Sequence, residues 1–439
     1  MKIGYRLALA ILAVGFIASS APAQDFYWTS ASARSLSLGG VYVPSSGDAV
    51  GALASNPAGL SSLGGPSLNL SVTTVFARGS FSNSANTDSP LRDSPGALPY
   101  GGFGMPIGHS RFSFGVGFVP DLMSVSNWRY VDPRGAGGVT YGLQEQKSAI
   151  LAGRAIAGFS ASFGPKLSIG ATFGSDYNSN TLIAPYIFQS QPTLKGLKTL
   201  LNLNTSGVGW NTSIGIRTQL SRKAEVGLAW KSRTKIDSTG TATGDAYALF
   251  GVPQGSPAST FAYSADVRNV LPQSVLASVN WQATSRWVLA FQTDWVNWGD
   301  AFVNLPVTLT NGTNAGINSV VGSSTLIDGV PLNWKDQYGF HAGGERVLTE
   351  NASLRFGYAY ANNPVPSSTL SPLTAAIMSN QISAGFVYQK GRSGFEGAYS
   401  FDPTAQESVQ QSGLLSGEYN NSTVHIGTQN LTASYSFRF

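Results

Sequence analysis

The chain has 439 residues, of which only 11% are charged, and its 27 Lys and Arg against 22 Asp and Glu give a formal net charge of +5. A soluble protein of this length usually divides into more than one domain, yet no linker and no shift in composition interrupts this chain. Cysteine is absent, which excludes a disulfide framework and thiolate metal sites, and the modest net charge gives no reason to expect a nucleic-acid partner.

The first residues have the composition of a secretory signal peptide. Lys2 and Arg6 form a basic start, an apolar run extends from Leu7 to Ile17, and Ala21-Pro22-Ala23 supplies the small residues of a cleavage site. A retained membrane helix would need about 20 apolar residues, and this run is shorter. We therefore expect a signal peptide at residues 1–23, cleaved after Ala23.

Residues 24–66 are rich in small residues and precede the first strand. They contain Ser32-Ala33-Arg34, Gly39-Gly40 and Asn56-Pro57-Ala58-Gly59. Taken alone, the last motif predicts only a turn, because Asn caps, Pro restricts φ and Gly permits positive φ. A segment that is too polar to span a membrane and that precedes a barrel could instead be a plug in the lumen of that barrel.

From residue 67 onwards apolar and polar residues alternate, which is typical of strands with one apolar face. In the last strand Leu431 to Phe439 supply the odd, apolar positions, and Thr432 to Arg438 supply the even, polar positions. A soluble sandwich could contain one such strand, but the leader and the repetition favour a membrane barrel with about fourteen strands. We expect strands at 67–79, 99–107, 111–120, 146–160, 165–188, 207–219, 223–240, 262–282, 286–302, 331–347, 351–361, 380–390, 393–403 and 429–439.

The predicted connections alternate between tight turns and long loops, as in outer-membrane barrels with short periplasmic turns. A closed barrel also satisfies every backbone group in lipid. Tryptophans near the strand ends are expected to form interface girdles. The long loops are predicted at 80–98, 121–145, 189–206, 241–261, 303–330, 362–379 and 404–428, and the girdle residues are Trp128, Trp210, Trp230, Trp281, Trp287, Trp295, Trp298 and Trp334.

One long loop carries leucines at helical spacing, namely Leu194, Leu197, Leu200 and Leu201, which predicts a short amphipathic helix over 193–203. Two interpretations are open. The helix could pack on the barrel rim, or it could form an apolar external groove that captures an amphiphile. Residues 248–252, with Phe250, would form the other wall of that groove, to which Leu370, Leu373, Ile377 and Met378 could contribute.

Strand parity predicts that charged residues line the lumen: Arg154, Arg217, Lys231, Arg233, Lys335, Arg355, Glu225, Asp294, Glu345 and Glu396. One interpretation is a mutually neutralising network that joins the wall to the N-terminal segment. The other is that one or two cations bind a carboxylate through charge-assisted hydrogen bonds. Arg154 is the first candidate for that role because apolar residues share its face, and Lys335 and Arg355 follow. A neutral hydrocarbon would give these cations no ligand role.

The N-terminal motifs, with Gly227–Ser232, Leu271-Pro272-Gln273 and Leu354–Tyr360, resemble the FadL/TodX family of outer-membrane channels for long-chain fatty acids and other hydrophobic compounds. The resemblance implies a hatch at residues 24–66, a transmembrane β-barrel at 67–439, and gating movement around Asn56, Pro57 and Ala58. It also implies that Phe26 reaches the cargo. Glycine inside a strand suggests a kink, and the resemblance implies that cargo leaves sideways at such a kink, here assigned to Gly115 and Gly117.

We therefore expect an all-β protein, a transmembrane antiparallel β-barrel of about 14 strands with a plugged lumen. Its expected function is passive uptake of long-chain fatty acids or other hydrophobic compounds. The alternatives are a polar-solute porin, in which residues 25–65 would be a periplasmic tail, and a surface adhesin. No nucleophile–base pair, phosphate loop or metal-ligand spacing stands out, so we expect neither an enzyme nor a cofactor.

The expected partners are a hydrophobic small-molecule cargo (a fatty acid, an alkane or an aromatic hydrocarbon) and outer-membrane lipid. The terminal Phe439 resembles the signal that the outer-membrane assembly machinery reads. The family resemblance implies a monomer in the bacterial outer membrane.

Overall fold

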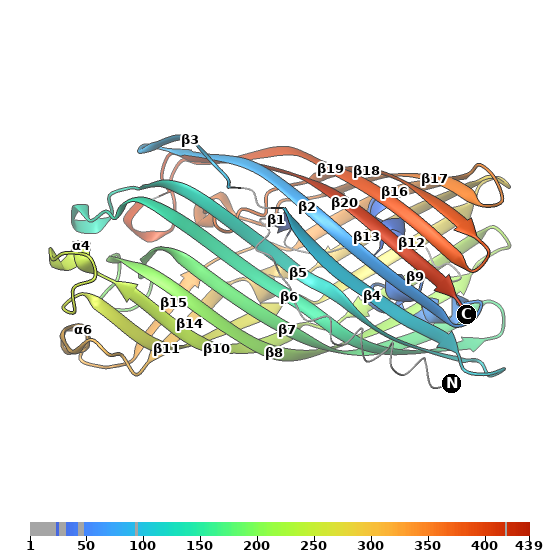
Figure 1. The fold of residues 1–439 in the computed structure, drawn as a ribbon, viewed down its shortest axis with the longest axis horizontal. Helices are drawn as coiled ribbons and strands as arrows, with labels where there is room; N and C mark the ends of the chain where they lie inside the picture. Colours follow the sequence, from blue (N-terminus) through green and yellow to red (C-terminus); the bar gives the residue numbers. More distant parts are fainter. Residues whose placement is uncertain (1–22, 26–31, 43–47, 93–94, 418) are drawn as a thin grey trace.

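The computed structural model describes residues 23–25, 32–42, 48–92, 95–417 and 419–439, and Figure 1 shows their arrangement. Most of the expected signal peptide, residues 1–22, and Phe26 lie outside the described residues. Among the described residues, no helix is long and apolar enough to cross a membrane.

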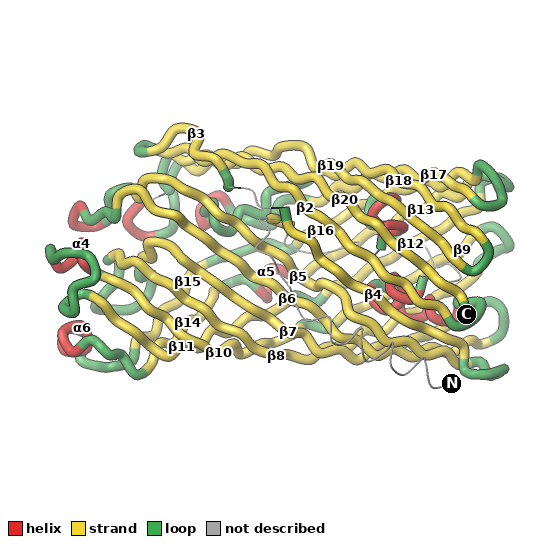
Figure 2. The backbone as a smooth tube through the Cα atoms, viewed as in Figure 1, coloured by secondary structure: helices red, strands yellow, loops and turns green. Residues whose placement is uncertain are grey.

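One antiparallel sheet closes on itself into a barrel of 14 strands (Figures 1 and 2), which confirms the predicted fold class. The last strand, β20 (Ser422–Arg438), pairs with the first, β2 (Ser67–Asn83), along almost their whole length. The strands between them are β4 (Gly96–Pro106), β5 (Phe112–Asp132), β6 (Gly142–Phe163), β7 (Leu167–Ile187), β8 (Lys198–Gln219), β9 continued by β10 (Ala224–Lys231, Thr234–Asp245), β11 continued by β12 (Thr260–Leu271, Ser274–Gln282), β13 (Trp287–Val296), β16 (Gln337–Val347), β17 (Ala352–Ala361), β18 (Asn380–Lys390) and β19 (Ser393–Val409).

Side chains alternate along each strand between an exposed apolar face and a buried polar face. Phe159 is 57% exposed and its neighbour Ser160 is 3% exposed, while Trp210 is 60% exposed and Asn211 is 3% exposed. This order is the reverse of that in a soluble protein, because the outer face of the barrel meets lipid and the inner face meets the lumen. The predicted alternation is therefore observed, with the apolar residues facing outwards and the polar residues facing the lumen.

The two ends of the barrel differ. Tight turns join the strands at the end that holds the C-terminus, and at three of these turns Gly108, Gly164 and Gly391 supply the positive φ. Long connections lie at the opposite end, where Figure 1 shows β3 (Asn86–Pro90), α4 (Tyr247–Phe250) and α6 (Ala315–Val321). The predicted alternation of short and long connections agrees with this arrangement.

A hairpin extends the wall at the end with the long connections. β14 (Asn304–Thr310) and β15 (Leu326–Pro331) pair with each other, and β14 also pairs with the outer part of β11. β13 ends at Val296, so without the hairpin the outer part of β11 would pair with β10 alone. The loop predicted at residues 303–330 is therefore mostly a hairpin in the structure.

The N-terminal segment, residues 32–42 and 48–63, lies within the barrel. Figure 2 shows its short helices towards the end of the barrel that holds the C-terminus. It consists of α2 (Ala33–Ser37), α3 (Ala49–Ala54) and the 3₁₀ turn η1 (Pro57–Ser62). Its groups bond to side chains on strands around the circumference: Ala33 N to Ser434 on β20, Gly39 N to Ser383 on β18, Tyr42 N to Gln292 on β13, Ala49 N to Asn69 on β2, and Ser61 Oγ to Ser160 on β6.

Each helix of this segment begins at a capping side chain. Ser32 and Ser35 form a capping box at α2, and Asp48 accepts a hydrogen bond from Gly51 N at α3. Burial raises the pKa of Asp48 to about 6, and the hydrogen bond from Gly51 opposes that rise. Docking of the segment therefore favours the neutral form of the Asp48 carboxyl. The resulting contribution to stability is fully present below the ordinary carboxyl pKa of about 4 and is lost as the pH rises through about 6.

Three of the tryptophans assigned to the interface girdles lie inside the barrel instead. Trp128 and Trp298 are fully buried, and Trp334 is 3% exposed. Trp128 follows a bend in β5, Trp298 begins α5 (Trp298–Ala301), and Trp334 precedes β16. The prediction was wrong for these three because a position near a strand end does not decide whether a side chain faces lipid or the lumen.

Candidate functional site

The Asn56–Ala58 motif forms a capped turn that is bonded to the barrel wall. Asn56 Oδ1 accepts a hydrogen bond from Ala58 N at 3.1 Å, and Asn56 Nδ2 donates to Ile216 O on β8 at 3.1 Å. Pro57 opens the 3₁₀ turn, where its missing N–H costs nothing. A Cβ atom on Gly170 of β7 would lie within 2.5 Å of Ala58 N and Pro57 O, so the turn approaches the wall where only glycine fits.

Gly115 and Gly117 do not form the kink in β5. Both pair regularly with β4 and β6. A Cβ on Gly115 would lie 2.9 Å from Leu60, and one on Gly117 would lie 3.0 Å from Leu53. These glycines therefore make room for apolar side chains of the N-terminal segment.

The irregularity lies further along β5, at Asp121. Pro120 pairs with Gly153 and Leu122 with Ala152, so Asp121 is the extra residue of a β-bulge, which bends its strand. Beyond the bulge, Met123 and Val125 are buried against Val75 of β2. The assignment of the kink to Gly115 and Gly117 is therefore corrected to Asp121.

The wall is interrupted beside this bend. β4 pairs with β5 only from Pro106 to Gly101 and then continues to Gly96 along β2 alone. Along the bent part of β5, the backbone of β1 (Ala23–Asp25) pairs with residues 123–125, and a bridge joins Leu91 to Trp128 further out. β4 and β5, which are adjacent in the barrel wall, thus separate beyond the pair Gly101–Phe118.

The bulge residue takes part in a buried charge network. Both oxygens of Asp121 accept hydrogen bonds from Lys231 Nζ, at 2.8 and 2.7 Å, and Arg154 lies 3.7 Å away. Arg154 also donates to Ala54 O at the end of α3, at 3.3 Å. Their side chains are at most 8% exposed. The network therefore connects the bend in β5 to the N-terminal segment, and with Asp294 it borders a cavity of about 50 Å³.

The other lumen cation that was a candidate, Arg355, is also paired. Its guanidinium contacts Glu345 at 3.2 Å and Glu396 at 2.6 Å, and Arg34 of α2 contacts Glu345 at 3.0 Å. Arg217 pairs with Glu225. Of the two interpretations of the lumen charges, the geometry agrees with the neutralising network that joins the wall to the N-terminal segment.

Two predicted lumen cations lie elsewhere. Lys335 is exposed in the connection before β16, and Arg233 is exposed between β9 and β10. Lys231 and Thr234 are both buried although they lie three positions apart, so the break between β9 and β10 shifts the alternation. The alternation of lumen-facing and outward-facing positions therefore continues only within uninterrupted strands.

His341 links the N-terminal segment to the wall at a second point. Its Nδ1 lies 2.6 Å from Gly39 O and its Nε2 lies 3.0 Å from Asp294 Oδ2. Gln292 donates to the same carboxylate and accepts from Tyr42 N. The groups that His341 contacts are distant in the chain, so no local sequence pattern indicates these contacts.

An apolar groove with a volume of about 270 Å³ lies among the long connections. Leu194, Leu197, Leu201 and Phe250 line it, as predicted from the sequence. The predicted helix is wrong, because residues 198–203 begin strand β8 and residues 192–196 form turns. In a strand, successive side chains face opposite sides, so Leu201 and Leu203 reach the groove and Leu200 does not.

The groove has a third wall that the sequence analysis missed. The β14–β15 hairpin and α6 contribute Leu305, Val307, Leu309, Ile317, Val320 and Leu326. Leu305, Val307 and Leu309 alternate with proline and threonine, and this period of two was the available signal for a strand. Conversely, Leu370, Leu373 and Ile377 belong to the apolar cluster in the lumen rather than to this groove.

The carboxylate of Asp328 fixes the connection between β7 and β8 against this third wall. It accepts hydrogen bonds from Tyr186 Oη at 2.6 Å, Ser190 N at 2.6 Å, Ser190 Oγ at 2.8 Å, and the backbone N–H groups of Gln189 and Gln191 at 3.0 Å. Asp328 is 5% exposed, so these donors replace its hydration.

We expect Asp328→Asn to loosen residues 186–191, because the amide has one acceptor oxygen and turns an NH₂ group towards the donors. Hydrogen bonds to a charged group contribute about 1.5–3 kcal/mol, so hydrogen exchange of these amides should be at least about tenfold faster. Asp266→Asn, an exposed position on β11, is the control. Unchanged exchange in the Asp328 variant would contradict the assigned role.

Comparison with known proteins agrees with this architecture. Residues 14–439 match the family model described as outer membrane protein transport protein (OMPP1/FadL/TodX). The long-chain fatty acid transport protein of Escherichia coli (strain K12) is 26% identical over 174 residues, which are 39% of this chain and 36% of that protein. The match thus spans little more than a third of that relative's length.

Solved structures are similar over almost the whole chain. The Pseudomonas putida toluene transporter TodX has a TM-score of 0.74 and 21% identity, and the match covers 95% of this chain and 100% of that one. The Ralstonia pickettii toluene transporter TbuX has a TM-score of 0.72 and 19% identity, with coverages of 93% and 98%. A Pseudomonas aeruginosa FadL homologue has a TM-score of 0.73 and 16% identity, with coverages of 94% and 99%. At these identities the likeness shows the fold.

Proposed function

Because the chain belongs to the OMPP1/FadL/TodX family of outer membrane protein transport proteins, we propose that it is a passive outer-membrane channel for hydrophobic compounds. The observation that carries this proposal is a continuous apolar path. Leu182 and Leu305 pack both against the cluster around the external groove and against the cluster in the lumen. A hydrophobic molecule that leaves the groove would therefore meet further apolar surface on its way inwards.

The exit that we propose is the interruption of the wall between β4 and β5. Movement of the Asn56–Ala58 turn would release Ala54 from Arg154, and the bend at Asp121 would then open sideways into the bilayer. A hydrophobic cargo that leaves in this direction need not cross water. In this proposal residues 24–66 act as the hatch, and Phe439, 57% exposed after β20, is read by the assembly machinery of a monomeric barrel.

The cargo class that fits the described lumen best is a neutral hydrophobic molecule. The guanidinium of Arg154 and the ammonium of Lys231 contact Asp121, and Arg355 contacts two glutamates. A fatty acid carboxylate would have to compete with these carboxylates for a buried cation, which would leave one anion without a partner. A porin is disfavoured because apolar side chains fill the outer lumen.

The test is uptake of radiolabelled toluene and radiolabelled oleate by outer-membrane-bearing cells that have no other channel of this family. We expect Leu201→Asp to reduce uptake at least about tenfold, because it places a carboxylate in the groove and removes a buried leucine that contributes about 1.5–3 kcal/mol. Leu200→Asp, on the opposite face of β8, is the matched control and should retain uptake. Equal uptake by the two variants would remove the groove from the route.

Toluene uptake without oleate uptake would support a neutral cargo, and preferential oleate uptake would restore the carboxylate-binding interpretation. If the wild-type channel takes up neither compound and conducts ions freely in planar bilayers, the porin replaces our proposal. If it neither conducts nor takes up either compound, the adhesin is favoured.

A further inference from the structure

The connection between β17 and β18, residues 362–379, turns into the barrel instead of extending outwards. Leu370 is 1% exposed, Ala375 0% and Ile377 3%, whereas Ser367 and Ser368 remain exposed at its outer end. We call residues 364–378 the inturned segment. External connections normally run over the surface, so the burial of this one requires an explanation.

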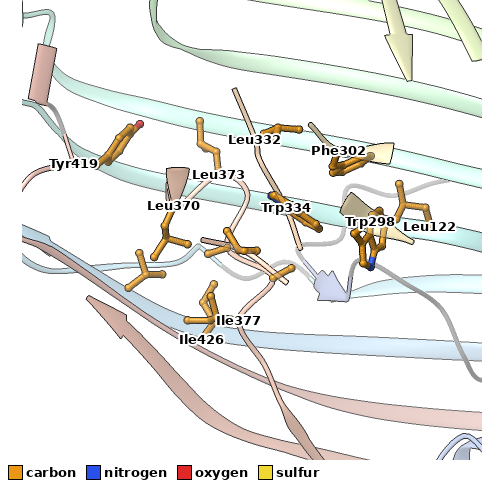
Figure 3. Packing of buried hydrophobic residues seen from close by; sticks show 14 of the residues in the cluster. Leu122, Trp298, Phe302, Leu332, Trp334, Leu370, Leu373, Ile377, Tyr419 and Ile426 are labelled. Atoms are coloured by element: carbon orange, nitrogen blue, oxygen red, sulfur yellow. The ribbon is translucent and has the colours of Figure 1, made fainter. Parts of the chain in front are cut away.

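The inturned segment fills an apolar chamber in the outer lumen. Figure 3 shows Leu370, Leu373 and Ile377 in one cluster with Trp334 and Ile426. On one side of the same cluster, the rings of Trp298, Phe302 and Trp334 contact one another with centroids 4.8–5.1 Å apart. Such an aromatic group offers faces and edges to an apolar molecule.

The inner part of the segment fills the chamber through apolar contacts that another apolar molecule could make, whereas its outer part is tied by hydrogen bonds, such as Thr369 Oγ1 to Leu332 O at 2.5 Å and Gly413 N to Ser368 O at 2.7 Å. Apolar burial is not directional and is roughly proportional to the area removed from water. A cargo that took the place of Leu370, Leu373 and Ile377 would therefore restore the burial of the chamber walls. Directional contacts of the segment with β5 include two hydrogen bonds: Trp128 Nε1 donates to Pro372 O at 2.9 Å, and Ser126 Oγ donates to Leu373 O at 3.4 Å.

We propose that the inturned segment occupies the chamber that the cargo enters, and that a neutral apolar cargo displaces it to bind against Trp298, Phe302 and Trp334. This inference rests on the proposed transport function and adds an internal competitor to it. The segment closes the outer lumen when the chamber holds no cargo. A ligand can shift such an equilibrium only by its differential affinity for the two states, and the vacated apolar surface supplies that difference.

The same displacement reaches the interrupted wall. Ser126 and Trp128 lie on the bent part of β5, beyond Asp121, where β4 no longer pairs with this strand. Leu122 of the same strand belongs to the chamber cluster. When the segment leaves, β5 loses two hydrogen-bond partners beside the break. Occupancy of the chamber is thereby coupled to the strand at which cargo would leave.

The absence of cysteine from the chain allows a reversible test. A Cβ on Gly413 would lie 3.7 Å from Ser368 Cβ, within the range of about 3.5–4.5 Å that disulfides adopt. The pair Ser368→Cys with Gly413→Cys therefore ties the outer end of the inturned segment to the connection between β19 and β20. The matched control is Gly394→Cys with Ser436→Cys, cross-strand partners with a Cβ separation of 3.8 Å at the end with the tight turns.

We expect the oxidised 368–413 pair to take up radiolabelled toluene at least tenfold more slowly than the same protein after reduction, and the control pair to change less than twofold. Titration of free thiols confirms that each bond has formed. Equal uptake by the oxidised and reduced 368–413 pair would overturn the inference. Failure of the wild-type protein to take up toluene or oleate would instead reject the proposed function, so the two failures are distinguishable.

A second variant tests the inference without a disulfide. Trp128→Phe keeps an aromatic ring in the chamber and removes the hydrogen bond to Pro372 O, so the segment should leave more readily and uptake should rise about two- to tenfold. Trp210→Phe, on the exposed face of β8, is the control. Unchanged or slower uptake by the Trp128 variant would contradict the coupling to β5.

Discussion

Gly170→Val is expected to force the Asn56–Ala58 turn away from the barrel wall and to raise the ion conductance of the channel. A Cβ at this position would lie within 2.5 Å of Ala58 N and Pro57 O, and backbone atoms of a tight turn cannot move aside as a flexible side chain can. Overpacking costs about 1–3 kcal/mol, which raises the undocked fraction roughly 5- to 150-fold. Single-channel recording in planar bilayers measures the result as open probability.

The matched control is Ala171→Val. Ala171 is the next residue of β7 and is exposed on the lipid-facing side, so the added methyl groups contact nothing in the lumen. Gly170→Ala should have an intermediate effect. If Gly170→Val folds into a barrel and conducts no more than the wild type, the turn does not obstruct the lumen and the proposed hatch function fails.

Asp121→Ala is expected to destabilise the barrel more than any other single substitution among the lumen charges. It would leave the ammonium of Lys231 and the guanidinium of Arg154 without their shared carboxylate, and both side chains are buried. Removal of one partner from a buried ion pair costs about 3–5 kcal/mol, since the remaining charge is shielded from water and has lost its nearest counterion. Unfolding by guanidinium in lipid vesicles measures the loss of free energy.

The double variant Asp121→Ala with Lys231→Met separates charge from packing. It removes one charge of each sign and leaves Arg154 near Asp176, whose carboxylate is close enough to interact with it. The double variant should therefore recover most of the lost stability, which a double-mutant cycle would record as a coupling energy. A single variant within about 0.5 kcal/mol of the wild type would show that water reaches these charges.

Three wrong predictions about the site share one physical cause. Leu194 to Leu201 match a helical spacing, but over so few residues that the same leucines also fit a turn followed by a strand. Strand β7 offers a continuous hydrogen-bonding partner that begins where Ile187 pairs with Lys198, and this pairing makes the residues from Lys198 onwards part of β8. Lys335 and Arg233 were placed by parity across breaks in the strands. Each error followed from extending a local period beyond the element that maintains it.

The bend in β5 illustrates a different limit. Glycine in a strand signals close approach as well as a kink. At Gly115 and Gly117 the approaching groups are Leu60 and Leu53, residues of a segment that is distant in the chain. The bulge occurs at Asp121, an ordinary polar residue by sequence, and its charge is compensated by Lys231 from 110 positions further along the chain. No local pattern identifies such a pairing.

The sequence by itself determined the barrel, the order of its strands, the alternation of short and long connections and the apolar character of the external groove. Lipid on one side and lumen on the other impose a period of two on every strand, and that period is written locally. Only the tertiary structure decided which lumen charges neutralise one another, where the wall separates and which connection turns inwards. These features depend on contacts between residues far apart in the chain, and the closure of the barrel, rather than any local preference, brings those residues together.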